Sequence, residues 1–172
     1  MKELPVRKNI RLSDYDYSKE GYYFITVCIK DKQKLLGKVA GDAVLGAPVV
    51  QLSDSGKIVQ EYLQKMNDIL ESAALENYII MPNHVHLLVA LDECMQDCGP
   101  LRAAPPANHL AKAMVPRIVH GMKTVVTKQI GYSIWQRSYH DHIIRNEADY
   151  RRIWRYIDEN PAKWADGCYY TV

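Results

Sequence analysis

The chain has 172 residues, of which 48% are hydrophobic and 24% charged, and its formal net charge is +2. This length and these proportions of hydrophobic and charged residues predict a single globular domain over residues 1–172. A charge so small gives by itself no argument for a nucleic-acid partner, and no apolar run approaches the roughly 20 residues needed to cross a bilayer. The N-terminus lacks the apolar segment of a signal peptide, and the four cysteines have no disulfide-type spacing. We therefore expect a cytoplasmic protein.

The first third of the chain predicts a strand, a β-hairpin and a helix. Residues 22–30 (YYFITVCIK) are rich in aromatic and β-branched side chains, which predicts a central strand. Apolar residues mixed with Gly and Pro predict a hairpin over 37–52. Ser53 or Asp54 then supplies the N-cap of a helix that is expected to run to about Leu70.

The middle of the chain predicts two paired strands followed by a loop. The apolar run 75–90 is interrupted by Pro82 and Asn83, which predicts two strands joined by a tight turn, with His84 opening the second strand. Residues 92–108 are rich in Gly and Pro and are expected to form a long loop.

The last third predicts a helix over 111–130, a short strand over 138–145 and a final helix over about 146–160. Asn146 caps the final helix and Pro161 ends it. The order of strands and helices predicts an α+β protein in which an antiparallel sheet is covered by helices, a ferredoxin-like or RRM-like sandwich.

The candidate site rests on two pairs of residues. His84 and His86 lie two residues apart in a predicted strand, so both imidazoles point to one face and can hold one ion or one phosphate. Tyr156 and Asn160 lie one turn apart on the flank of the final helix, where a phenol and an amide oxygen can converge. Together the two pairs predict a tyrosine nucleophile beside a metal ion.

Three ordered segments carry a family resemblance. The run 81–86 (MPNHVH), the run 134–146 (IWQRSYHDHIIRN) and Tyr156 four residues before Asn160 resemble the IS200/IS605-type transposases. These are single-tyrosine members of the HUH endonuclease superfamily, and the likeness is greatest to their REP-associated tyrosine transposase branch. Residues 7–37 resemble them too, so the similarity extends over nearly the whole chain.

The resemblance implies a metal-dependent single-stranded DNA endonuclease and strand transferase that acts on DNA hairpins. Tyr156 matches the catalytic tyrosine, which attacks a phosphodiester to give a 5′-phosphotyrosine link and a free 3′-hydroxyl. His84 and His86 match the HUH histidines, which with Asn160 are expected to hold Mg²⁺ or Mn²⁺. Arg7, Lys8, Arg11 and Arg137 are the candidates for contact with DNA.

One departure bears on the branch of the family. Insertion-sequence members typically have Gln four residues after the tyrosine, whereas this chain has Asn160. Asn followed by Pro161 favours the REP-associated branch. Insertion-sequence members act as homodimers that exchange their tyrosine helices, and REP-associated members can be monomers, so the sequence leaves both states open.

Two alternatives remain open. A non-catalytic module could bind single-stranded DNA or RNA hairpins on an RRM-like sheet, with Tyr22, Tyr23 and Phe24 as stacking platforms. Cys94 and Cys98 could join the histidines in a zinc site, although their irregular spacing disfavours it.

Overall fold

The computed structural model describes residues 19–41, 48–70, 72–92 and 114–164. Within these ranges an antiparallel main sheet has the strand order β4-β5-β1-β6. Its members are β1 (Gly21–Cys28), β4 (Ala73–Met81), β5 (His84–Leu91) and β6 (His140–Ile144). The strands β2 (Gly37–Ala40) and β3 (Val49–Leu52) pair with each other in a separate two-stranded sheet. The predicted central place of the first strand is confirmed, because β1 pairs with both β5 and β6.

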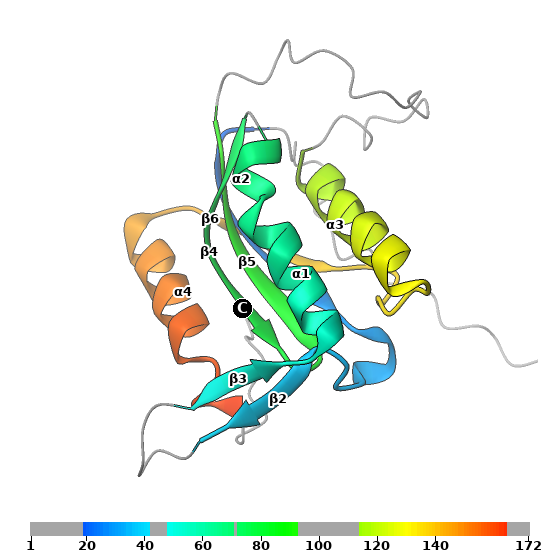
Figure 1. Ribbon diagram of the computed structural model, residues 1–172. Helices are drawn as coiled ribbons and strands as arrows, with labels where there is room; N and C mark the ends of the chain where they lie inside the picture. Colours follow the sequence, from blue (N-terminus) through cyan, green and yellow to red (C-terminus); the bar gives the residue numbers. More distant parts are fainter. Residues whose placement is uncertain (1–18, 42–47, 71, 93–113, 165–172) are drawn as a thin grey trace, which may run out of the picture.

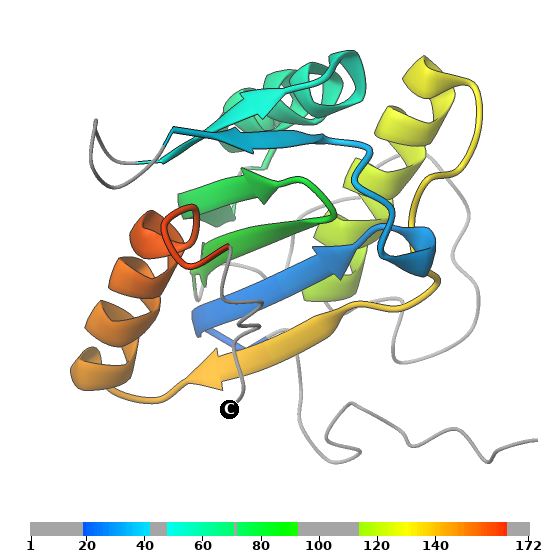
Figure 2. The ribbon, with the colours of Figure 1, turned by 90° about the horizontal axis from the view of Figure 1, so that it is seen from below.

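The helices lie on both faces of the main sheet. Figures 1 and 2 show α1 and α3 on one face and α4 on the other. Their bounds are α1 (Asp54–Gln64), α2 (Met66–Ile69), α3 (Met114–Ile130) and α4 (Glu147–Glu159), with a short 3-10 turn, η1, at Lys30–Lys32. The main strands with α1 and α3 follow the ferredoxin-like order β-α-β-β-α-β, which confirms the predicted fold class. No helix in the described ranges has the length and apolar character of a membrane span.

Side chains of β1 point alternately to the two faces of the sheet, and the core has one layer on each face. Tyr23, Ile25 and Val27 are buried with the apolar faces of α1 and α3, whereas Phe24 is buried on the opposite face with Ile153 and other residues of α4. Successive strand residues point to opposite faces of a sheet, so one strand supports both layers. The smaller layer, between the sheet and α4, is the one that contains the histidines.

The predicted helix from Ser53 to Leu70 is one place where the structure differs from the prediction. Ser53 is the N-cap, and its hydroxyl accepts a hydrogen bond from the Gly56 backbone N–H, but the helix breaks at Lys65 into α1 and α2. After the break, the side chain of Asn67 accepts a 2.7 Å hydrogen bond from the Leu75 backbone N–H at the start of the next strand. A contact with a strand thus shapes the end of this helical segment.

Helix α4 matches its prediction closely. The Asn146 side chain accepts a hydrogen bond from the Asp149 backbone N–H, and Asn160 is the C-cap residue. The helix contacts β4, β5 and β6. Ile153 and Ile157 are buried against the sheet, with Tyr150 and Trp154 packed around them. This arrangement fixes the rotation of the helix and therefore the position of Tyr156.

Packing of α4 on the sheet is testable at Ile157, which is 1% exposed. Ile157→Ala should lower the free energy of unfolding by about 2–4 kcal/mol, because it opens a cavity beneath the helix. Arg151→Ala is the control on the exposed side of the same helix, with an expected loss below about 0.5 kcal/mol. Urea denaturation measures both values, and equal losses would contradict this packing.

Candidate active site

The two histidines lie side by side at the beginning of β5, on the sheet face that α4 covers. His84 is 3% exposed and His86 is 1% exposed. The strand register places His86 directly opposite Thr26 of β1 on one side and Ile79 of β4 on the other. Both rings are therefore buried between the sheet and α4. Polar side chains in such a place are rarely found without hydrogen-bond partners.

The imidazoles contact each other through their Nε2 atoms, which are 3.0 Å apart. Each ring also has a partner for its other nitrogen. His84 Nδ1 lies 2.7 Å from the side-chain oxygen of Asn83, and His86 Nδ1 lies 2.9 Å from the hydroxyl of Thr26. All four ring nitrogens thus have a neighbour with which they can share a proton.

From these contacts we assign the protons of the pair. The Asn83 amide nitrogen donates to the Lys32 carbonyl, which leaves its oxygen facing His84, so His84 Nδ1 donates and His84 Nε2 carries a lone pair. In the absence of an ion, His86 Nε2–H then donates across the 3.0 Å contact, and His86 Nδ1 accepts from Thr26. The threonine hydroxyl can also accept, so it suits either tautomer of His86.

Burial keeps both rings uncharged at neutral pH. It lowers the pKa of His84 from its ordinary 6.5 to about 4. Burial, and to a smaller extent the charge of neighbouring His84, lowers the pKa of His86 well below 6.5. Metals bind the neutral form of imidazole, so the pair is in the form that can act as a ligand.

The spacing of the two Nε2 atoms fits a divalent ion. Two nitrogen ligands about 2.1 Å from one ion and at right angles to each other are about 3.0 Å apart, and the observed separation is 3.0 Å. Among the described residues no cluster of three His, Cys, Asp or Glu side chains can hold a metal. Any third protein ligand in this part of the chain is therefore of another type, such as an amide oxygen.

Tyr156 lies directly against His86 of the histidine pair. Its half-buried ring meets the His86 ring edge to face, with 5.3 Å between the centroids, and meets Phe24 in the same manner at 6.0 Å. Phe24 in turn stacks on His86 at 4.9 Å. The phenol and the two imidazoles, more than 60 residues apart in the sequence, thus form one aromatic cluster between the sheet and α4.

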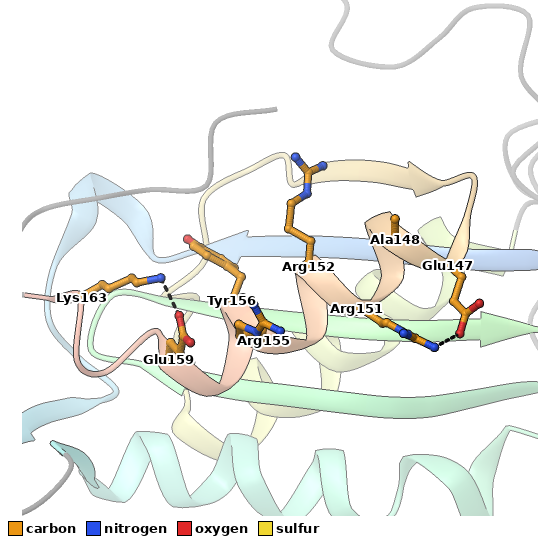
Figure 3. Close-up of a pocket in the computed structure, with 8 residues that line it drawn as sticks. All are labelled: Glu147, Ala148, Arg151, Arg152, Arg155, Tyr156, Glu159 and Lys163. Carbon is orange, nitrogen blue, oxygen red and sulfur yellow. Dashed lines mark hydrogen bonds and ion pairs between the residues drawn. The ribbon is translucent and has the colours of Figure 1, made fainter.

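The outer side of Tyr156 lines a hollow of about 710 Å³ along α4. Figure 3 shows that the side chains around it project from one side of the helix, with Glu147 near one end and Lys163 near the other. The residues that line it are Glu147, Ala148, Arg151, Arg152, Arg155, Tyr156, Glu159 and Lys163. We call this hollow the α4 groove; the Tyr156 side chain is part of its lining, while its phenol oxygen is buried.

Of the other predicted site residues, Asn160 and Arg137 lie in the described part of the chain. Asn160 is 4% exposed at the end of α4, one turn after Tyr156. Arg137 is exposed between α3 and β6. Arg7, Lys8 and Arg11 lie outside the described residues, as do the cysteines of the zinc alternative, so their predicted roles stay predictions.

Sequence reasoning missed three residues of this cluster. Thr26 meets His86 only through the pairing of β1 with β5, which no local pattern reveals. The alternative hypothesis places Phe24 on a binding surface, whereas in the structure it contacts His86 and Tyr156. Trp164 follows α4 and approaches His84, with 6.1 Å between the ring centroids, and the Lys34 ammonium lies 5.8 Å from the Trp164 ring centre. The alternation of strand residues is the signal that could have found Thr26 and Phe24, since both share a face with the histidines.

Two of the three stacking residues of the alternative hypothesis are buried in the structure. Tyr23 is fully buried on the α1–α3 side, and Phe24 is 3% exposed beneath α4. Tyr22 is 42% exposed, but its ring packs edge to face on Tyr150 with 4.9 Å between the centroids. Bases cannot stack on Tyr23 and Phe24, because both rings are covered.

Known proteins show the same architecture and related sequences. No protein-family model matches the chain. An uncharacterized protein of Haemophilus influenzae is 32% identical over 167 residues, which cover 92% of this chain and 89% of that protein. A second protein of this bacterium, described as "Putative REP-associated tyrosine transposase", is 26% identical over 156 residues, or 88% of this chain and 77% of that protein.

A solved structure agrees with these sequence matches. It is that of a REP-associated tyrosine transposase bound to a REP hairpin, with a TM-score of 0.54 and 21% sequence identity. The match covers 89% of this chain and 74% of that one, which shows a shared fold. The chain thus belongs to the IS200/IS605-like family and is a homologue of the REP-associated tyrosine transposases.

Proposed function

We propose that the protein is a metal-dependent single-stranded DNA endonuclease and strand transferase that acts on DNA hairpins through a 5′-phosphotyrosine intermediate. The observation that carries this proposal is the contact of the Tyr156 ring with His86, whose Nε2 lies 3.0 Å from that of His84. The proposed nucleophile thus lies next to the proposed metal ligands, and the chain is related to a protein described as a putative REP-associated tyrosine transposase, which supports the proposal.

Tyr156 would act as the nucleophile in two opposite steps. In the first, its oxygen forms a bond to the scissile phosphorus as the bond from phosphorus to the 3′-oxygen breaks, and the phenol proton is lost while the 3′-oxygen gains one. In the second, a 3′-hydroxyl attacks the phosphotyrosine and releases Tyr156. Each step exchanges one phosphodiester for another, so strand transfer needs no external energy source.

His84, His86 and Asn160 would hold the metal ion. A divalent ion at this position would polarise the scissile phosphate and neutralise charge that develops on its oxygens. Asn83 and Thr26 would orient the two rings, since a hydrogen bond at Nδ1 of each imidazole directs its Nε2 lone pair toward the ion. Neutral imidazole with an amide oxygen is a ligand set for Mn²⁺ or Mg²⁺.

The proposed substrate is single-stranded DNA with a hairpin. The related REP-associated transposase was solved with a REP hairpin bound to it. We extend that class of ligand to this chain, with Arg137 and the N-terminal residues Arg7, Lys8 and Arg11 as candidate contacts.

The nucleophile is tested with end-labelled hairpin oligonucleotides in Mn²⁺, by denaturing gel electrophoresis. Wild-type protein should form a covalent adduct with the 5′-phosphate of the fragment downstream of the cut, and the upstream fragment should end in a free 3′-hydroxyl. Tyr156→Phe should form none, because it lacks the attacking oxygen, while its affinity for the hairpin stays within about twofold.

Tyr150→Phe is the matched control, since Tyr150 lies on the same helix and packs against the same small core. It should form the adduct at the wild-type level. An adduct with Tyr156→Phe, or binding without any adduct across a broad panel of hairpins, would refute the proposed chemistry.

The role of Thr26 is tested by calorimetric titration of the protein with Mn²⁺ at pH 7. Thr26→Val keeps the shape of the side chain but removes the hydroxyl partner of His86 Nδ1, so Mn²⁺ affinity should fall by about tenfold. Thr26→Ser, which retains the hydroxyl, should recover most of the affinity. Wild-type affinity in Thr26→Val would show that this hydrogen bond does not orient His86.

A further inference from the structure

The α4 groove has a regular arrangement of charge. Its outer row consists of residues four apart on the helix and its extension, Glu147, Arg151, Arg155, Glu159 and Lys163. A parallel inner row, one residue further along at each turn, consists of Ala148, Arg152 and Tyr156. Residues four apart lie on the same side of a helix, so the two rows run together toward the tyrosine.

Most of the basic side chains in these rows are paired with carboxylates. Arg151 pairs with Glu147, and Lys163 pairs with Glu159 at 2.7 Å (Figure 3). Arg152 pairs with Asp149 at 2.6 Å. Asp149 also lies 2.7 Å from His142 Nε2, and although burial raises the pKa of this carboxyl, its bonds with His142 and Arg152 lower it overall. The exposed pairs of Arg151 with Glu147 and of Lys163 with Glu159 are weak and exchange readily for another anion.

Arg155 differs from its neighbours, because it makes no ion pair with any described residue. It is exposed at the middle of the outer row and directly precedes Tyr156 in the chain. Its charge helps Lys163 to lower the pKa of Glu159, which places it within electrostatic reach of that carboxylate. A guanidinium with free donors next to the nucleophile is well suited to a phosphate.

We propose that the α4 groove holds the sugar–phosphate backbone of the single-stranded DNA that enters the site, with Arg155 and Arg152 on the phosphates next to Tyr156. This inference rests on the proposed function, because it identifies how the substrate reaches the proposed nucleophile. The opposite side of α4 is packed on the sheet, whereas the groove is open to solvent. Ala148, with its small side chain, leaves room at the N-terminal end of the groove.

A solvated helix face, held by pairs four residues apart, is the simpler explanation of the same residues. It accounts for Arg151 and Lys163, each of which has its own carboxylate. It does not account for Arg155, nor for the position of Tyr156 in the same hollow as these cations. The two explanations differ in the effect that they predict for Arg155 substitutions on the affinity for single-stranded DNA.

The test measures binding of a fluorescent 15-nucleotide oligo-dT to the full-length protein by anisotropy, in EDTA and at several NaCl concentrations. Arg155→Gln should weaken binding about fivefold at low salt and reduce the slope of log affinity against log salt by about 0.7, the share of one phosphate contact. Arg152→Gln should act in the same direction. Arg155→Lys, which keeps the charge, should retain most of the affinity.

Lys128→Gln is the matched control, because Lys128 is exposed on α3 across the sheet and makes no ion pair with the described residues. It should bind within twofold of wild type. The proposal is overturned if Arg155→Gln behaves like this control, or if wild-type protein does not bind the oligonucleotide even at low salt.

The adduct experiment separates this proposal from the proposed function. If wild type forms the phosphotyrosine adduct but Arg155→Gln binds normally, the groove proposal fails and the chemistry stands. If no adduct forms but Arg155→Gln loses affinity, the groove binds DNA and the proposed chemistry fails.

Discussion

Burial of two neighbouring imidazoles between the sheet and α4 is the constraint on which the rest of the site depends. An unpaired polar ring in a protein interior is costly, so each histidine needs partners for both nitrogens. The structure supplies them from three different segments: Asn83 in the turn before β5, Thr26 on β1 and the other histidine. Protonation of either ring is disfavoured by this environment. Because the folded-state pKa lies below that of the unfolded chain, falling pH should erode stability from about pH 6.5 downward through the folded pKa near 4.

The same burial explains the placement of the tyrosine. Ile153 and Ile157 attach α4 to the sheet and fix its rotation, which directs Tyr156 to the histidines and Arg151 and Arg155 to solvent. Phe24 fills the space between the helix and the strand and contacts both His86 and Tyr156. The site is therefore part of the second core layer, and its geometry is coupled to the packing of α4.

Much of the fold could be predicted from local sequence, because strong signals agree there. Asn146 and Pro161 define the ends of α4, and the Pro82–Asn83 turn defines the start of β5. Local sequence could not predict the features that depend on contacts with residues far away in the chain. The break at Lys65 accompanies a side-chain contact from Asn67 to the next strand. The burial of Phe24 depends on α4, more than 120 residues later, and the role of Thr26 depends on strand register.

The candidate site was predictable in its chemistry but not in its surroundings. The spacing of His84 with His86 places both rings on one face of any strand, and that expectation is confirmed by their 3.0 Å contact. The pairing of charges along the α4 groove requires knowledge of which helix face is packed. Sequence alone shows a cluster of arginines near a tyrosine, and the structure distinguishes the paired members from Arg155.

The most direct test of the central claim is to identify the residue that carries DNA after cleavage. The chain has 12 tyrosines, and trypsin cuts after Arg155 and Lys163, which gives the peptide 156–163 with Tyr156 as its tyrosine. The covalent complex would be digested with nuclease and trypsin and examined by tandem mass spectrometry. The account predicts a nucleotide attached to the phenol oxygen of Tyr156 in this peptide. A nucleotide on another residue would contradict the assignment of the nucleophile and the site built around it.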